Sequence, residues 1–193
     1  MSDFDALVSE IRACTVCAES LPLGPRPVVS VHPEARLLII GQAPGRRVHG
    51  SGVPWDDPSG VRLRQWMGID GATFYDPRRV AIVPMGFCYP GTGKSGDLPP
   101  RPECAELWHQ RILDRLGNVQ LTLLLSQYAQ AHYLGTRRKK TLTETVRAWR
   151  DYGPEFMPLP HPSPRNNRWL KKNPWFEVDV LPELRSRVAA ALG

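Results

Sequence analysis

Four cysteines have the spacing that most directly suggests chemistry in this sequence. Cys14 and Cys17 form a Cys-x2-Cys pair, and Cys88 follows about seventy residues later, with Cys104 after fifteen more. Thiolates bind zinc or iron, and their spacing alone does not separate a zinc site from an iron-sulfur cluster. Buried thiols that only fill space are an alternative, whereas a disulfide framework suits a secreted chain better. We predict a four-cysteine metal site and leave the metal open.

Two short motifs carry further groups that could act on a ligand. The first is the turn Gly41-Gln42-Ala43-Pro44-Gly45, followed ten residues later by Trp55, and the second is His161-Pro162-Ser163-Pro164. Small residues let backbone amides approach a ligand, an indole offers a stacking surface, and a histidine can donate a hydrogen bond to a developing anion. Taken alone, Trp55 could equally be a core or turn aromatic, and His161 a satisfied loop histidine.

Short apolar runs alternate with helical patterns and must position these motifs. Strands buried on both faces are typical of parallel sheets, so the alternation predicts an α/β fold: a central, mostly parallel sheet of about four strands with helices on both faces. The expected strands are 37–40, 80–85, 119–126 and 156–159, and the expected helices are 3–14, 60–67, 102–116, 142–150 and 182–192. Ligands collect at the carboxyl ends of such strands, which directs attention to the loops 41–59, 86–101 and 160–173.

Composition limits the class of protein. The 193 residues, 41% of them hydrophobic, fit one domain spanning 1–193. With 25 basic and 19 acidic side chains the net charge is +6, which attracts polyanions such as nucleic acid. The sequence has no apolar run of about 18 residues and begins with an acidic segment, so we expect a cytoplasmic protein without membrane contact, and a monomer.

The order of these motifs resembles the uracil-DNA glycosylase superfamily, and in particular its family 4 branch. The resemblance runs from the Cys14 pair to the loop at His161, which is most of the chain. It implies a three-layer α/β fold and a [4Fe-4S] cluster held by Cys14, Cys17, Cys88 and Cys104, with zinc as the alternative. It also implies that Trp55 stacks on the base, that His161 donates to the O2 atom of the departing base, and that Gly41 and Ala43 line the substrate pocket.

Three positions depart from the family pattern. Gln42 replaces the family 4 glutamate that positions water, Ala43 replaces the family 1 aspartate, and Pro84 replaces the asparagine that reads the uracil edge. Neither an amide nor a methyl group can act as a general base. Asp57, beside Asp56 after Trp55, could supply a carboxylate, although aspartates in such loops are often turn formers.

Basic residues after His161 predict a DNA-binding loop. These residues are Arg165, Arg168, Lys171 and Lys172, and the resemblance places Asn166 with Arg165 at the DNA. Three aromatics alternate with the cations, an arrangement that suits phosphate contact plus stacking; alternatively, the tryptophans pack on the sheet. The segment 91–96 lacks the full Walker spacing and is read as a loop that contacts DNA phosphate.

We therefore expect a DNA glycosylase of base excision repair that hydrolyses the glycosidic bond of uracil or another deaminated base. A monofunctional reaction is favoured because the motif loops hold no obvious Schiff-base lysine, with Lys94 left open. The alternative is a protein of the same fold that binds DNA lesions or abasic sites with little or no turnover. Gln42 and Pro84 keep that alternative open.

Overall fold

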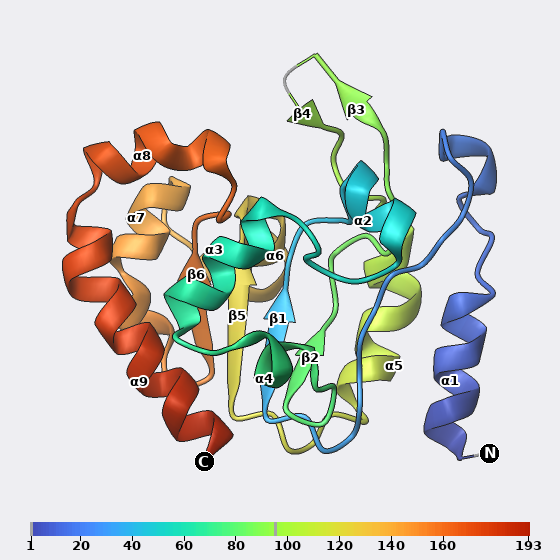
Figure 1. Ribbon diagram of the computed structural model, residues 1–193, viewed down its shortest axis with the longest axis horizontal. Coiled ribbons are helices and arrows are strands. Elements are labelled where there is room, and N and C mark those ends of the chain that lie inside the picture. Colours follow the sequence, from blue (N-terminus) through green and yellow to red (C-terminus); the bar gives the residue numbers. More distant parts are fainter. Residues whose placement is uncertain (1, 95) are drawn as a thin grey trace.

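The computed structural model describes residues 2–94 and 96–193 and contains a central four-stranded parallel sheet (Figure 1). The strand order is β2 (Val80–Ile82), β1 (Leu37–Ile40), β5 (Leu121–Leu125) and β6 (Phe156–Leu159). In register, Leu38 of β1 pairs with Ala81 on one side and Thr122 on the other. All carboxyl ends therefore lie at one edge of the sheet, which is where ligands are expected in such folds.

Alternate residues of the central strand build two separate cores. Leu37 and Ile39 pack with residues of α3 (Pro58–Met67), α4 (Gly71–Tyr75), α7 (Leu142–Arg147) and α9 (Leu181–Leu192). Leu38 and Ile40 pack with residues of α1 (Asp3–Arg12), α5 (Gln110–Leu113) and α6 (Gln127–Leu134). Because successive side chains of a strand point to opposite faces, helices cover both sides of the sheet. The predicted three-layer α/β fold is confirmed.

Several of the remaining elements lie around the carboxyl edge of the sheet. A small antiparallel hairpin of β3 (Thr92–Gly93) and β4 (Gly96–Asp97) stands above this edge (Figure 1). Helices α2 (Arg46–Ser51) and α8 (Asn167–Lys172) follow the two motif turns. Short 3₁₀ turns span Ala18–Ser20, Gly135–Arg137, Trp149–Tyr152 and Pro164–Asn166, and π-helical turns span Ala105–His109 and Phe176–Val180.

Several element boundaries differ from the sequence prediction. The strand expected over 80–85 is shorter in the structure, where β2 ends at Ile82. Val83 and Met85 still donate to Ile39 and Gly41 of the neighbouring segment, so Pro84 occupies an edge position that tolerates proline. The expected helix 102–116 is a π turn followed by the short α5, and the helices α2, α4, α6 and α8 were not predicted. No helix of the described residues is long and apolar enough to cross a membrane.

Candidate active site

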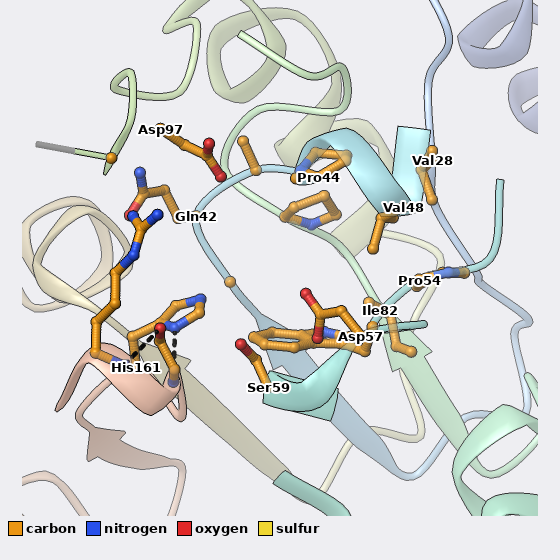
Figure 2. A pocket seen from close by; sticks show the side chains of 18 of the residues that line it. Val28, Gln42, Pro44, Val48, Pro54, Asp57, Ser59, Ile82, Asp97 and His161 are labelled. Atoms are coloured by element: carbon orange, nitrogen blue, oxygen red, sulfur yellow. Dashed lines mark hydrogen bonds between the residues drawn. The ribbon is translucent and has the colours of Figure 1, made fainter. Parts of the chain in front are cut away.

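A cavity of about 430 Å³ opens at the carboxyl edge, between the turn after β1, the segment after β2 and the loop after β6 (Figure 2). Its lining brings together nine of the residues singled out from the sequence: Gly41, Gln42, Ala43, Trp55, Asp57, Pro84, His161, Arg165 and Asn166. Residues far apart along the chain thus share one site, as the parallel topology requires. The lining also includes three polar residues that were not predicted, Ser59, Asp97 and Ser163.

Trp55 is held in an unusual backbone conformation. Its φ of 58° lies in the left-handed region, which is costly for a bulky residue. Two glycines make room for it: a Cβ on Gly60 would lie 1.8 Å from the Trp55 carbonyl oxygen, and a Cβ on Gly41 would lie 2.9 Å from its indole. The Tyr75 hydroxyl donates to the same carbonyl at 3.4 Å. The surrounding chain therefore fixes this indole at the cavity.

His161 faces Trp55 with a defined tautomer. The two rings have centroids 5.4 Å apart. The backbone N–H of Ser163 donates to Nδ1 of His161 at 3.2 Å, so the proton of the neutral ring resides on Nε2. Burial lowers the pKa of His161 below its ordinary value, while the charges of Asp57 and Asp97 oppose that shift. The ring is a neutral hydrogen-bond donor through Nε2 near neutral pH.

Two side chains fix the loop that carries His161. Arg62, on α3, donates to the Ser163 carbonyl at 3.1 Å, and the Asn166 side chain donates to the His161 carbonyl at 2.7 Å. The first contact joins residues 101 positions apart and links the helix after the Trp55 loop to the histidine loop. Asn166 was expected at the DNA; in the structure its amide holds the histidine loop.

Asp57 lies where the Trp55 loop enters α3. One carboxylate oxygen accepts the Gly60 N–H at 2.8 Å and so caps the helix. The same residue lines the cavity, so its negative charge also faces any ligand there (Figure 2). Asp56, by contrast, approaches Arg47 at 3.9 Å and is not part of the lining. Of the two adjacent aspartates, Asp57 is the one that lines the cavity.

Gln42 and Pro84, the two departures from the family pattern, each make one hydrogen bond, through the side chain of Gln42 and through the backbone carbonyl of Pro84. The Gln42 amide Nε2 donates to the carbonyl oxygen of Leu98 at 3.4 Å. The Pro84 carbonyl accepts a hydrogen bond of 3.0 Å from Nε2 of the buried His109, whose Nδ1 accepts from the Tyr133 hydroxyl at 2.6 Å. Burial lowers the pKa of His109 to about 4, so this ring is neutral. A lone histidine in a helical pattern gave no sequence signal for this role.

The predicted DNA-binding residues separate into two groups. Arg168, Lys171 and Lys172 are exposed on α8, whereas Arg165, also exposed, lines the cavity. The tryptophans of this segment are packing residues: Trp169 and Trp175 lie against the core, and the Trp169 indole N–H donates to the Thr143 hydroxyl at 2.9 Å. Of the two alternatives for these tryptophans, the structure shows packing on the sheet, because both rings lie partly buried against the core.

The four cysteines converge on a second, much smaller cavity. Cys14, Cys17, Cys88 and Cys104 line it together with the apolar residues Leu21, Pro25, Pro27, Phe87 and Trp108, and with Arg101. All four are free thiols. Burial raises the pKa of Cys104 to about 12, and the Phe87 backbone N–H donates to its sulfur at 3.3 Å. The two sequence pairs, about seventy residues apart, thus share one apolar site.

The donor set fits a thiolate-bound cofactor in two respects. Thiols directed into one apolar cavity are the ligands that iron-sulfur clusters use, and N–H donation to a ligand sulfur is a typical feature of such sites. Among residues 2–94 and 96–193, no three cysteine, histidine or acidic side chains are arranged to hold a single metal ion. The identity of the bound group stays a prediction.

Comparison with known proteins identifies the family. The model of the uracil DNA glycosylase superfamily matches residues 29–185, which contain both motif turns and most of the cavity lining. The chain belongs to this superfamily, a family of DNA glycosylases, so a DNA substrate is the class of ligand the fold serves. The match does not separate the branches of the superfamily, and the family 4 assignment stays a prediction.

One similar solved structure is the wild-type SMUG2 protein of Pedobacter heparinus. The two chains are 13% identical, with 96% of this chain and 95% of that chain covered, and a TM-score of 0.43.

Proposed function

We propose that this protein hydrolyses the N-glycosidic bond of uracil or another deaminated base in DNA, as a monofunctional glycosylase. The observation that carries this proposal is the pairing of Trp55 with a neutral, Nε2-protonated His161 beside the Gly41–Gly45 turn in one cavity. A base extruded from the duplex needs a stacking surface and a donor aimed at the oxygen where negative charge develops. This cavity offers both.

The residues would divide the reaction as follows. The extruded base stacks on Trp55, whose ring position is fixed by Gly41 and Gly60. As the glycosidic bond breaks, its electron pair moves into the base, and the Nε2–H of His161 donates to the base oxygen that becomes anionic. The sugar develops positive charge, which the negative charge of Asp57 stabilises from across the cavity. A water molecule then adds to the anomeric carbon.

The cavity lacks the asparagine side chain with which the family reads the edge of uracil, and this affects base preference. Pro84 occupies the position at which the family uses an asparagine edge reader, and its ring offers no hydrogen bond. Its carbonyl is engaged by His109. Discrimination between uracil, hypoxanthine and xanthine would therefore rest on the cavity's shape and on the remaining backbone groups, and we expect a broader preference than an amide side chain would impose.

The DNA backbone would contact the exposed cations of α8. Arg168, Lys171 and Lys172 present three positive charges on a helix that begins one residue after Asn166, close to the cavity entrance. Such contacts position a duplex without reading its sequence. Arg165, which lines the cavity in this structure, would meet the nucleotide or the gap that it leaves.

We further propose that Cys14, Cys17, Cys88 and Cys104 hold a [4Fe-4S] cluster, with zinc as the alternative. The cluster is favoured because each thiolate then binds its own iron, an arrangement that does not require several thiols around one ion. Bound there, such a group would have a structural role, because these cysteines would join the segment after α1 to the segment after β2. Purified protein with broad absorption near roughly 400 nm and bound iron supports the cluster. Colourless protein with one zinc supports the alternative.

The test of the activity is direct. Wild-type protein is incubated with duplex and single-stranded oligonucleotides that contain one uracil, hypoxanthine or xanthine, and abasic sites are then cleaved by alkali. We expect strand breaks at the modified base with at least one of these substrates. Trp55→Ala should reduce excision while leaving non-specific DNA affinity nearly intact, because the indole acts on the extruded base only.

A second candidate function is binding of lesions or abasic sites without turnover. It is favoured by Gln42, whose amide is used to hold Leu98 and offers no carboxylate to water. Absence of excision for every base tested, together with tight binding to an abasic duplex, would support this function and contradict the glycosylase.

A further inference from the structure

The carboxylate missing from the turn after β1 has a counterpart on the β3–β4 hairpin. We propose that Asp97 is a catalytic residue of this protein: it holds the attacking water and accepts its proton. This inference rests on the proposed glycosylase function and concerns the same cavity. Asp97 lines that cavity, and Figure 2 shows it with Gln42 on the side opposite Val48 and Pro54.

Two hydroxyl groups orient the Asp97 carboxylate. The Thr92 hydroxyl donates to Oδ1 of Asp97 at 3.2 Å, and the Tyr89 and Thr92 hydroxyls are 2.5 Å apart. Because the Thr92 proton is directed to the carboxylate, the Tyr89 hydroxyl is the donor to Thr92. Within the described residues Oδ2 has no hydrogen-bond partner. A chain of donors thus fixes one oxygen and leaves the other for a ligand.

The free oxygen is directed to the turn after β1. A Cβ on Gly45 would lie 3.5 Å from Oδ2 of Asp97, so the lack of a side chain at Gly45 leaves space beside this oxygen. The charge of Asp97 also acts on His161, whose pKa it raises against the effect of burial. The carboxylate and the imidazole therefore belong to one electrostatic site, although they come from segments more than sixty residues apart.

Gln42 contributes by holding the hairpin. Its amide donates to the carbonyl of Leu98, the residue that follows Asp97, and the Leu98 N–H donates to the Gly91 carbonyl at 2.8 Å. A glutamate at position 42 could not donate to that carbonyl and would place a second negative charge near Asp97. The Gln42 amide thus helps to position the Asp97 carboxylate, by holding the residue next to it.

The two aspartates of the cavity differ in what they can do. Asp57 and Asp97 each have one oxygen engaged, by the helix cap at Gly60 and by Thr92, and one oxygen without a hydrogen-bond partner among the described residues, so their places in the cavity decide their roles. Asp57 stays with the Trp55 loop as a fixed negative charge. Asp97 has a free oxygen on the side of the turn after β1. The carbon–nitrogen bond breaks first, and its electron pair leaves with the base. The water oxygen then forms a bond to the anomeric carbon, and the water proton passes to Asp97 and then to solvent.

The experiment compares the Asp97 carboxylate, which lines the cavity, with the Asp56 carboxylate, which does not. We expect Asp97→Asn to lower the single-turnover excision rate about a hundredfold, the scale of a lost general base. The control is Asp56→Asn, which removes an exposed carboxylate outside the cavity lining and should leave the rate unchanged. Thr92→Val should lower the rate about tenfold and Thr92→Ser should restore it, since only the hydroxyl orients Asp97. In the Asp97→Asn background, Thr92→Val should cause no further loss.

A binding measurement gives a second readout that does not depend on turnover. DNA with a cationic pyrrolidine in place of the sugar mimics the developing charge, whereas a neutral tetrahydrofuran site does not. A carboxylate that delivers water to the anomeric carbon must lie close to that carbon, so its charge adds to the charge of Asp57 there. Asp97→Asn should therefore weaken binding to the pyrrolidine site by roughly tenfold relative to the tetrahydrofuran site. If wild type excises a base and Asp97→Asn matches it in rate and in this ratio, the role of Asp97 is overturned while the glycosylase function stands. If wild type excises no base, both proposals fail.

Discussion

The active-site cavity and the cysteine cavity differ in size, lining and openness. The active-site cavity of about 430 Å³ is lined by a histidine, two aspartates, an arginine and backbone turns from three separate loops. The cysteine cavity is about 20 Å³ and is enclosed mostly by apolar residues and four thiols. One is open enough to admit and release a nucleotide, and the other suits a group that stays in place. A short segment after β2 serves both, because Pro84 lines the first cavity and Phe87 and Cys88 line the second.

This difference indicates that the active-site cavity serves the reaction and the cysteine cavity serves the stability of the fold. A group that acts on the substrate needs a hydrogen-bond donor or acceptor that is not already used within the protein, such as the Nε2–H of His161. The cysteines need only converge on one centre. If this division is correct, changes at the cysteines should act on folding first, and changes around the active-site cavity should act on the excision rate.

The largest effect is expected from Cys104→Ala. Removal of one ligand should abolish stable cofactor binding and leave little folded protein, because the thiols join distant segments. Iron and zinc content and thermal unfolding of the purified protein measure this. Val16→Ala, an exposed residue between the first two cysteines, is the matched control and should leave both values unchanged. Full metal content and an unaltered unfolding temperature in Cys104→Ala would contradict the convergence of the four thiols.

His109 should make the stability of the fold depend on pH. This histidine is 2% exposed, and its pKa is about 4 in the folded chain against an ordinary 6.5. The unfolded chain therefore takes up a proton below pH 6.5 that the folded chain does not, and stability falls as the pH decreases from 6.5 to 4. The loss is roughly 3 kcal/mol over this window. Urea unfolding of wild type and His109→Gln at several pH values measures it, and equal pH dependence in both proteins would contradict the prediction.

Arg62 should affect the rate and not the fold. Its bond to the Ser163 carbonyl positions the histidine loop, so Arg62→Ala should lower single-turnover excision about tenfold, which corresponds to about 1.4 kcal/mol. Arg185→Ala removes a comparable bond to a backbone carbonyl, at Gln65, and serves as the control. The prediction fails if both variants excise at the wild-type rate.

The smallest effect concerns non-specific DNA binding. Replacing Arg168 and Lys172 by alanine should reduce the slope of log affinity against log salt by roughly two units, about one for each phosphate contact. The pair Arg36→Ala and Arg78→Ala removes the same charge from exposed positions that precede β1 and β2, at the opposite edge of the sheet. A slope that changes equally in both double variants would show that α8 does not face the DNA backbone.

The sequence predicted the parts of the molecule that are set by local pattern and by parallel topology. The apolar runs at 37–40 and 156–159 are strands with the predicted bounds, and the loops that follow them meet at one cavity. Contacts made only by the tertiary fold were missed. The position of the histidine loop depends on the bond from Arg62 to the Ser163 carbonyl, and the role of Gln42 depends on the Leu98 carbonyl. Nothing in the local sequence indicates either contact.

Asp97 and the tryptophans Trp169 and Trp175 show the same limit of sequence-based prediction. Asp97 lies in a glycine-rich segment whose pattern suggests phosphate contact, and only the hairpin brings its carboxylate to the cavity. Trp169 and Trp175 alternate with cations as a stacking surface would, yet their rings are used by the core. Alternation of residue types does not show which face of a short helix is buried.

The central claim is that the Trp55–His161 cavity breaks a glycosidic bond, and one paired measurement tests it most directly. Wild type and His161→Ala are compared on the same duplex with one deaminated base, for the single-turnover rate of abasic-site formation and for affinity to the abasic product. We expect the rate to fall about a hundredfold or more, a loss of about 3 kcal/mol in transition-state stabilisation, with product affinity nearly unchanged. An unchanged rate, or a loss of affinity as large as the loss of rate, would contradict the account.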